Sequence, residues 1–200
     1  MKTFITIILM CLALTGVQGQ NEVNPFIEPE FNPPIVYLGL STGLENMIGL
    51  IGPQIEIVAS RPLRVGGGIG ISSWGTKWAV NLQYYPKDWY KLFFKTGYSR
   101  NSGLDDFETE LKLASGSMED VRLNLNPVDN LFVTIGYAWK VGKRNKFYLE
   151  GGYAIPLTTE DYYTLLDPVE LHSDAKNELR TLRPGGLVLA VGINFAVGNK

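Results

Sequence analysis

Apolar and polar residues alternate along most of the chain from residue 35 to residue 198, which is the pattern of β-strands. The stretch "TKWAVNLQYYPKDWYKLFFKTGYSR", residues 76–100, shows the alternation twice, on either side of a turn. A soluble sandwich would bury the apolar face of such a pair. A membrane barrel would turn the apolar face to lipid and the polar face to its lumen.

Eight such runs occur in the chain, and each is close to the roughly 9 to 11 residues that a tilted strand needs to cross a bilayer. No other apolar run after the amino-terminal segment is long enough for a transmembrane helix. The runs lie near residues 35–43, 49–59, 63–73, 76–86, 90–100, 130–141, 146–157 and 186–198.

The lengths of the links between these runs support an all-β, eight-stranded antiparallel up-and-down transmembrane β-barrel. The second, fourth and sixth links ("SRPL", "KDW", "GKRN") are short, whereas the fifth (about 101–129) and seventh (about 158–185) are long. Short periplasmic turns and longer extracellular loops are typical of such barrels. A ten-strand alternative would use "TELKLAS" and "DVRLNLN" as well, but their shortness and acidic ends favour an extracellular hairpin.

The amino terminus has the layout of an export signal. Residues 1–19, "MKTFITIILMCLALTGVQG", combine a basic Lys2 with an apolar run and small residues, which is typical of a cleaved signal peptide. We expect residues 20–34, "QNEVNPFIEPEFNPP", to form a flexible periplasmic arm. Cleavage would remove Cys11, the single cysteine, so we expect no disulfide, thiolate chemistry or cysteine metal site.

The composition alone would suggest a soluble protein, since the mean hydropathy is +0.01. Barrel strands give such values because only alternate residues meet lipid. Outward aromatic residues cluster near the two ends of the strands, as in the girdles at membrane interfaces. These residues are Tyr84, Tyr90, Trp139, Phe147 and Phe195 at the short-turn end, and Trp78, Tyr98 and Tyr153 at the other.

Strand parity places a network of polar residues inside the barrel, where eight strands leave room for little more than side chains. We expect the two acids to pair with some of the four cations and to form a polar plug. A narrow anion-preferring pore or small-solute uptake remains an alternative. The predicted network is Glu56, Arg64, Lys77, Lys91, Lys95 and Glu150, accompanied by Gln54, Asn81, Gln83 and Tyr148.

The two long loops are acidic. Residues 101–129 hold seven acids against Lys112 and Arg122, and residues 158–182 hold six against Lys176 and Arg180. Spacings such as "DDFETE" do not match a calcium loop, so we expect a solvated acidic surface, with no metal and no cofactor. Nucleic acid is excluded as a partner because no basic stripe lies outside the lumen and the "GKRNK" turn.

Catalysis is a minor alternative, since some small barrels modify lipids. The one histidine, His172, stands beside Ser173 and Asp174 in the seventh link, and neighbours on a loop rarely hold the geometry that activates a nucleophile. We therefore predict that the protein is not an enzyme. "GGGIG", residues 66–70, lacks a following helix start and is interpreted as strand glycine facing the lumen.

The signal peptide, the alternating strands with "RVGGGIGISS" and "YLEGGYAIPL", and the closing "GLVLAVGINFAVG" resemble the small outer-membrane β-barrel proteins of Gram-negative bacteria, often labelled porin-like. The resemblance covers residues 35–198. It implies an outer-membrane location, contact with outer-membrane lipid and lipopolysaccharide, and insertion by the barrel-assembly machinery. It also implies an assembly signal in the last strand, matched by Gly192, Phe195 and Val197.

The expected role is structural, or is an interaction through the acidic extracellular loops, and we expect a monomer. One further alternative inverts the two faces. A soluble periplasmic lipocalin-like barrel would hold an apolar ligand inside and turn its polar faces to water.

Overall fold

The computed structural model describes residues 36–86, 91–158 and 162–197. The predicted signal peptide (1–19) and periplasmic arm (20–34) lie outside these ranges. Within them, no helix has the length and apolar character needed to cross a membrane.

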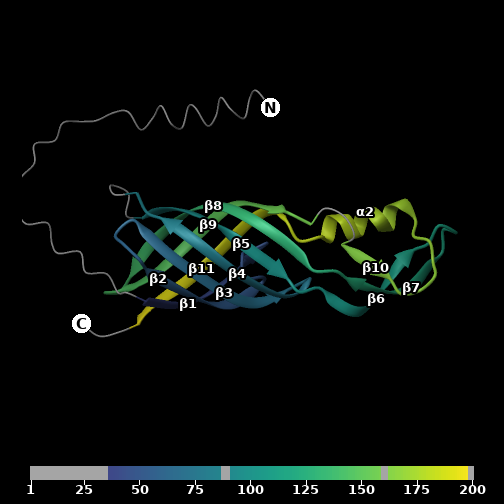
Figure 1. Cartoon of the computed structure of the whole chain (residues 1–200), viewed down its shortest axis with the longest axis horizontal. Coiled ribbons are helices and arrows are strands. Elements are labelled where there is room, and N and C mark those ends of the chain that lie inside the picture. Colours follow the sequence, from purple (N-terminus) through teal and green to yellow (C-terminus); the bar gives the residue numbers. More distant parts are fainter. Residues whose placement is uncertain (1–35, 87–90, 159–161, 198–200) are drawn as a thin grey trace, which may run out of the picture. The chain divides into compact units, whose positions relative to one another are not determined.

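Eight antiparallel strands close into a barrel, in which each strand pairs with the barrel strands that precede and follow it in the sequence (Figure 1). β1 pairs with both β2 and β11, so the closed sheet has no free edge. The eight predicted runs are confirmed, with ends that differ by a few residues. The strands are β1 (Val36–Leu44), β2 (Ile51–Val58), β3 (Leu63–Ser72), β4 (Gly75–Tyr84), β5 (Leu92–Asn101), β8 (Val128–Val141), β9 (Asn145–Pro156) and β11 (Gly186–Val197).

Burial alternates along the strands because successive side chains point to opposite faces of the sheet. In β8, Phe132 is 1% exposed inside the barrel, whereas its neighbour Val133 is 58% exposed on the outer surface. The interior also buries charged groups, including Glu56 and Lys95. The barrel thus presents apolar side chains outward and encloses polar ones, as the alternation predicts.

The two long links fold together into a helix and a separate three-stranded sheet, and we call this sheet the outer sheet. β6 (Leu104–Lys112), β7 (Met118–Leu125) and the short β10 (Tyr163–Leu165) pair in the order β10-β7-β6. "TELKLAS" and "DVRLNLN" fall on the β6–β7 hairpin outside the barrel, so the ten-strand alternative is wrong. The short β10 and α2 (Ser173–Leu182) in the seventh link were not predicted.

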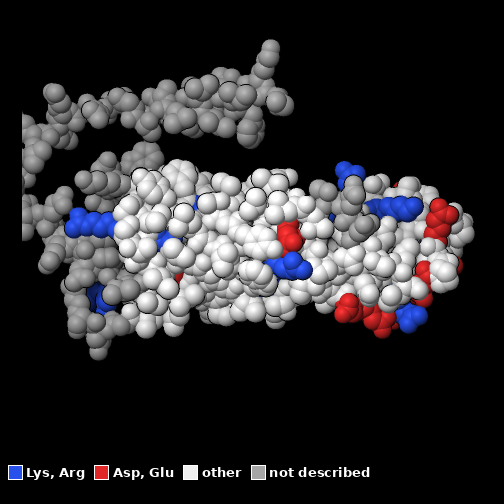
Figure 2. Space-filling model, viewed as in Figure 1, with Lys and Arg blue, Asp and Glu red and all other residues white. Residues whose placement is uncertain are grey.

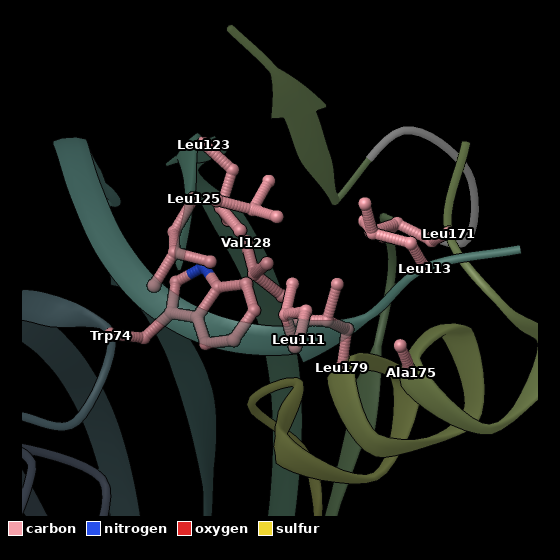
Figure 3. Close-up of a cluster of buried hydrophobic side chains, with 10 residues drawn as sticks. Trp74, Leu111, Leu113, Leu123, Leu125, Val128, Leu171, Ala175 and Leu179 are labelled. Atoms are coloured by element: carbon pink, nitrogen blue, oxygen red, sulfur yellow. The ribbon is translucent and has the colours of Figure 1, made fainter. Parts of the chain in front are cut away.

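A compact apolar core holds the outer sheet against α2 (Figure 3). Ala175 and Leu179, one helical turn apart, bury one side of α2 in this core. The helix begins after His172, whose Nδ1 accepts a hydrogen bond from the Asp174 N–H. The core residues are Trp74, Leu111, Leu113, Val121, Leu123, Leu125, Val128, Leu171, Ala175 and Leu179.

Trp74 joins the outer sheet to the barrel. It lies in the tight turn between β3 and β4 and is 2% exposed, packed in the core of the outer sheet (Figure 3). Its indole Nε1 donates to the Asn126 carbonyl at 2.8 Å, and its own carbonyl accepts from Gly103 N–H at 3.2 Å. The outer sheet is therefore anchored at the end of the barrel opposite the short turns, which we call the loop end.

Candidate functional site

A carboxylate held by two cations fills the lumen near the short-turn end, the end that carries the β2–β3, β4–β5 and β8–β9 links. Glu56 Oε1 accepts from Arg64 Nη1 at 2.8 Å, and Glu56 Oε2 accepts from Lys146 Nζ at 2.6 Å. The Arg64 guanidinium also stacks on the Tyr85 ring, 3.9 Å from its centroid. These contacts hold three charged side chains out of solvent.

A second ion pair lies deeper in the lumen. Lys95 Nζ is 2.5 Å from Glu150 Oε2, and the two side chains are 2% and 1% exposed. Thr134 Oγ1 donates to the same carboxylate oxygen at 3.4 Å, and the ammonium lies 5.0 Å from the centroid of the Tyr148 ring. Both acids of the predicted network are thus paired with cations.

Aromatic rings occupy the remaining space of this half of the lumen. The Phe93 ring lies where a side chain at Gly136 would be, and the Tyr148 ring does the same at Gly192. The space enclosed by Gln54, Glu56, Gln83, Tyr85, Phe93, Lys95, Lys146, Tyr148 and Asn194 has no room for a water molecule. Among the described residues, side chains therefore fill this half of the lumen.

At the loop end of the barrel, residues 45–49 of the link between β1 and β2 fold inward, and we call them the inward loop. Asn46, Met47 and Ile48 are 0%, 4% and 0% exposed. The loop turns in through positive φ values of 46° at Glu45 and 98° at Gly49. Met47 Sδ accepts a hydrogen bond from Asn81 Nδ2 at 3.3 Å, so the loop contacts the wall of the barrel directly.

The glycine run of β3 makes room for the inward loop. A Cβ at Gly68 would come within 2.7 Å of Ile48 Cγ2, and a Cβ at Gly70 would collide with the Ile48 carbonyl oxygen. Glycine is needed here because the backbone of another segment approaches the strand closely. The interpretation of "GGGIG" as lumen-facing strand glycine fits this arrangement.

Glu45 holds the inward loop to two other segments. Its Oε2 lies 3.4 Å from Lys77 Nζ, which projects into the lumen from β4. The same oxygen accepts from the Gly185 N–H at 3.2 Å, just before β11 begins. One carboxylate therefore links the loop to opposite parts of the barrel wall.

The structure places five of the six predicted network residues inside the barrel: Glu56, Arg64, Lys77, Lys95 and Glu150. The placement of Lys91 in the lumen is wrong. Lys91 is exposed in the turn before β5, because that strand begins at Leu92, two residues later than expected. The alternation of inward and outward side chains along β5 therefore does not extend to Lys91.

Two members of the lumen network were missed. Lys146 has the same parity as Tyr148 in β9, so the alternation could have identified it. Glu45 lies in a link, where alternation carries no information about which way a side chain points. The predicted assembly-signal residues lie in β11, with Gly192 beneath the Tyr148 ring and Phe195 and Val197 exposed outward at 46% and 44%.

The outer sheet carries most of the exposed acids. In its hairpin, Glu110 lies directly opposite Asp120, a pairing of like charges that is unfavourable unless solvent screens it. Among the described residues, no three acids or histidines are placed to hold a metal ion.

Ion pairs and hydrogen bonds to Arg122 and Lys112 stabilise some of these acids. The Arg122 N–H and guanidinium donate to Asp167 at 2.9 Å and 3.2 Å and lower the pKa of that carboxyl. Lys112 Nζ donates to Asp174 at 3.0 Å and, with His172 nearby, lowers the pKa of Asp174. His172 therefore acts as a helix cap beside an ion pair, which is a structural arrangement.

Comparison with solved structures shows a similar fold. No family model matches the chain, and no curated protein matches it. The crystal structure of Acinetobacter baumannii CarO is similar at a TM-score of 0.48 and 14% sequence identity, over 85% of this chain and 100% of that one.

Proposed function

We propose that this protein is a non-enzymatic integral β-barrel of a bacterial outer membrane, which presents its outer sheet and α2 on the cell surface. Its filled lumen stabilises the barrel from within. The observation that carries the proposal is the continuous outward belt of apolar side chains on a sheet that closes around buried charges.

The belt runs around all eight strands. A water-soluble protein rarely exposes a contiguous apolar surface of this extent. In a bilayer the same surface is favourable, and closure pairs the backbone groups that lipid cannot solvate. Outward residues more than 40% exposed include Leu40, Ile55, Ile69, Val80, Leu82, Phe94, Val133, Ile135, Leu149, Ile155, Leu189 and Phe195.

The interior supports this orientation over that of a soluble binder. A lipocalin-like barrel needs an apolar cavity, whereas this lumen holds Glu56, Lys95 and Glu150 and has no space for a ligand within the described network. Aromatic side chains lie at both rims of the belt, with Trp139 against Phe147 at one end and Trp78 against Tyr98 at the other. Such rings favour the headgroup level of a membrane.

A pore is the second candidate, because cations outnumber acids in the lumen. Arg64, Lys77, Lys95 and Lys146 face Glu45, Glu56 and Glu150. Anion passage would require the inward loop and the aromatic rings of the other half to move together. The filled state favours a structural role for the network.

Within this proposal the chain is exported by its amino-terminal signal and inserted as a monomer by the barrel-assembly machinery, which reads Gly192, Phe195 and Val197. The acidic outer sheet then meets partners outside the cell. Lipopolysaccharide surrounds the barrel at this level.

Cell fractionation combined with gel migration tests the proposal. The full chain, expressed in a Gram-negative host, is expected in the outer-membrane fraction, and the unheated sample is expected to migrate differently from the heated one in detergent. Val133→Lys places a charge in the belt and should reduce the folded, membrane-borne form, whereas Lys176→Glu on α2 should leave it unchanged. Recovery of the wild type as a soluble periplasmic protein would contradict the proposal.

A further inference from the structure

The hairpin between β8 and β9 concentrates positive charge at the short-turn end. Its sequence "KVGKRNK" carries four cations in seven residues. Lys140 and Lys146 stand directly opposite each other in the register, which is unfavourable for two like charges. Lys146 turns into the lumen to Glu56, whereas Lys140 and Lys143 are exposed. The hairpin therefore displays cations that the lumen acid does not neutralise.

The exposed acids among the described residues lie at one end of the barrel axis, together with fewer cations, whereas the other end exposes cations. Arg61 and Lys91 add two exposed cations to the short-turn end, where the described acid is the buried Glu56. Figure 2 shows basic side chains at this end, and acidic side chains with some basic ones among them over the outer sheet. The exposed acids are Asp105, Asp106, Glu108, Glu110, Glu119, Asp120, Glu170, Asp174 and Glu178.

The aromatic ring beside these cations indicates their level relative to the membrane. Trp139 directly precedes Lys140, faces outward, and packs 4.8 Å from Tyr137 and 5.7 Å from Phe147 between ring centroids. Tryptophan and tyrosine prefer the headgroup level, so Lys140 lies at that level or just beyond it. The strands are joined by a link of three residues, 142–144, so Lys143 stays within a few ångströms of the same level.

We propose that this basic rim, with Lys91, Lys140 and Lys143 as its exposed lysines, binds the phosphate groups of anionic phospholipids in the adjoining leaflet. Ammonium groups bind phosphate as point charges, and lysines near an anionic leaflet are attracted to its surface. The opposite, acidic end has no such attraction. The inference rests on the proposed membrane location and names the lipid class that meets one end of the barrel.

Quenching of Trp139 fluorescence by brominated lipids tests the rim. The full chain with Trp78→Phe and Trp89→Phe leaves Trp139 and the buried Trp74, so lipid-dependent quenching reports the short-turn rim. The protein is placed in phosphatidylcholine vesicles containing a minor fraction of brominated phosphatidylglycerol or, in parallel, of brominated phosphatidylcholine. We expect about a tenfold preference for phosphatidylglycerol at low salt, which shrinks as salt screens the charges.

The matched variants remove equal charge from the two ends. Lys140→Gln/Lys143→Gln should lower the preference to about twofold, whereas Lys176→Gln/Arg180→Gln on α2 should leave it unchanged.

An unchanged preference in the Lys140/Lys143 variant would overturn the inference while leaving the barrel inserted. Loss of binding to isolated peptidoglycan in that variant, with lipid preference intact, would assign the rim to the cell wall instead. Absence of quenching by either lipid would contradict membrane insertion itself.

Discussion

Lys95 on β5 and Glu150 on β9 form a buried ion pair that crosses over β8, the strand between them in the barrel. Removing one partner of such a pair leaves a charge without compensation in a medium that solvates it poorly. Removing both leaves no charge to solvate. We therefore expect that substitutions of the two residues have strongly non-additive effects on the free energy of unfolding.

Lys95→Met and Glu150→Gln are each expected to lower the free energy of unfolding by about 3 to 5 kcal/mol. The double variant should lose clearly less than the sum, because no isolated charge remains. Urea unfolding in detergent, followed by tryptophan fluorescence, measures all three. Simple additivity would show that the two groups do not stabilise each other.

Glu56 is expected to be more sensitive to neutralisation than an exposed charge nearby. It serves both Arg64 and Lys146, so Glu56→Gln leaves two cations without their carboxylate and should cost about 3 to 5 kcal/mol. Lys91→Gln, in the exposed turn before β5, is the control and should change stability by less than about 0.5 kcal/mol. Equal effects in the same unfolding assay would contradict the described lumen.

A side chain at Gly136 is expected to destabilise the barrel, because the Phe93 ring covers this position. Gly136→Ala should cost about 1 to 3 kcal/mol by overpacking the lumen. Gly151→Ala is the matched control. Its Cβ would meet Leu189 Cδ2 at an ordinary 3.5 Å, so this variant should leave the free energy of unfolding nearly unchanged. A stable Gly136→Ala variant would mean that Phe93 does not fill the lumen there.

Asp167 is expected to make the contact between β7 and the segment after β10 sensitive to acid. Its lowered pKa means that the unfolded segment takes up a proton at higher pH than the folded one. The stabilisation is therefore fully present above about pH 4, the ordinary range of an aspartate, and is lost as pH falls through the folded pKa.

Hydrogen exchange at Leu166 measures this loss, because its N–H donates to the Arg122 carbonyl at 3.0 Å. The protection factor should fall as pH is lowered below about 4. Asp167→Asn should start with lower protection and show little change over the same range. Protection that declines equally in both proteins would assign the acid response to another group.

The barrel was predictable because the two faces of a closed sheet, one apolar and outward and one polar and inward, impose a strict period of two on the sequence. Val133 and Phe132 differ in exposure for that reason, and the same parity placed Glu56 and Lys95 inside. Lys91 was misplaced because strand ends are where the alternation stops being informative. Which side chains pair across the lumen, as Lys146 does with Glu56, depends on how the barrel closes and not on local sequence.

The links were less predictable, because their structure depends on contacts between segments far apart in the chain. The inward loop is buried only because Gly68 and Gly70 on β3 leave space for Ile48. The helix α2 forms from "SDAKNELRTL", whose Ala175 and Leu179 have the right spacing for one buried face. That short pattern gains its stability from the outer sheet, which sequence alone did not show.

Spin labelling of consecutive residues along β8 determines whether the outward apolar face of the barrel meets lipid. Single cysteines at positions 131–137, in a Cys11→Ser background, carry a nitroxide in protein reconstituted into phosphatidylcholine vesicles. Labels replacing Leu131, Val133 and Ile135 should collide with oxygen and not with a water-soluble nickel reagent, whereas labels replacing Phe132 and Thr134 should collide with neither. Strong collision of the nickel reagent with labels at the odd-numbered positions would show that the belt faces water, and would contradict a membrane-spanning barrel.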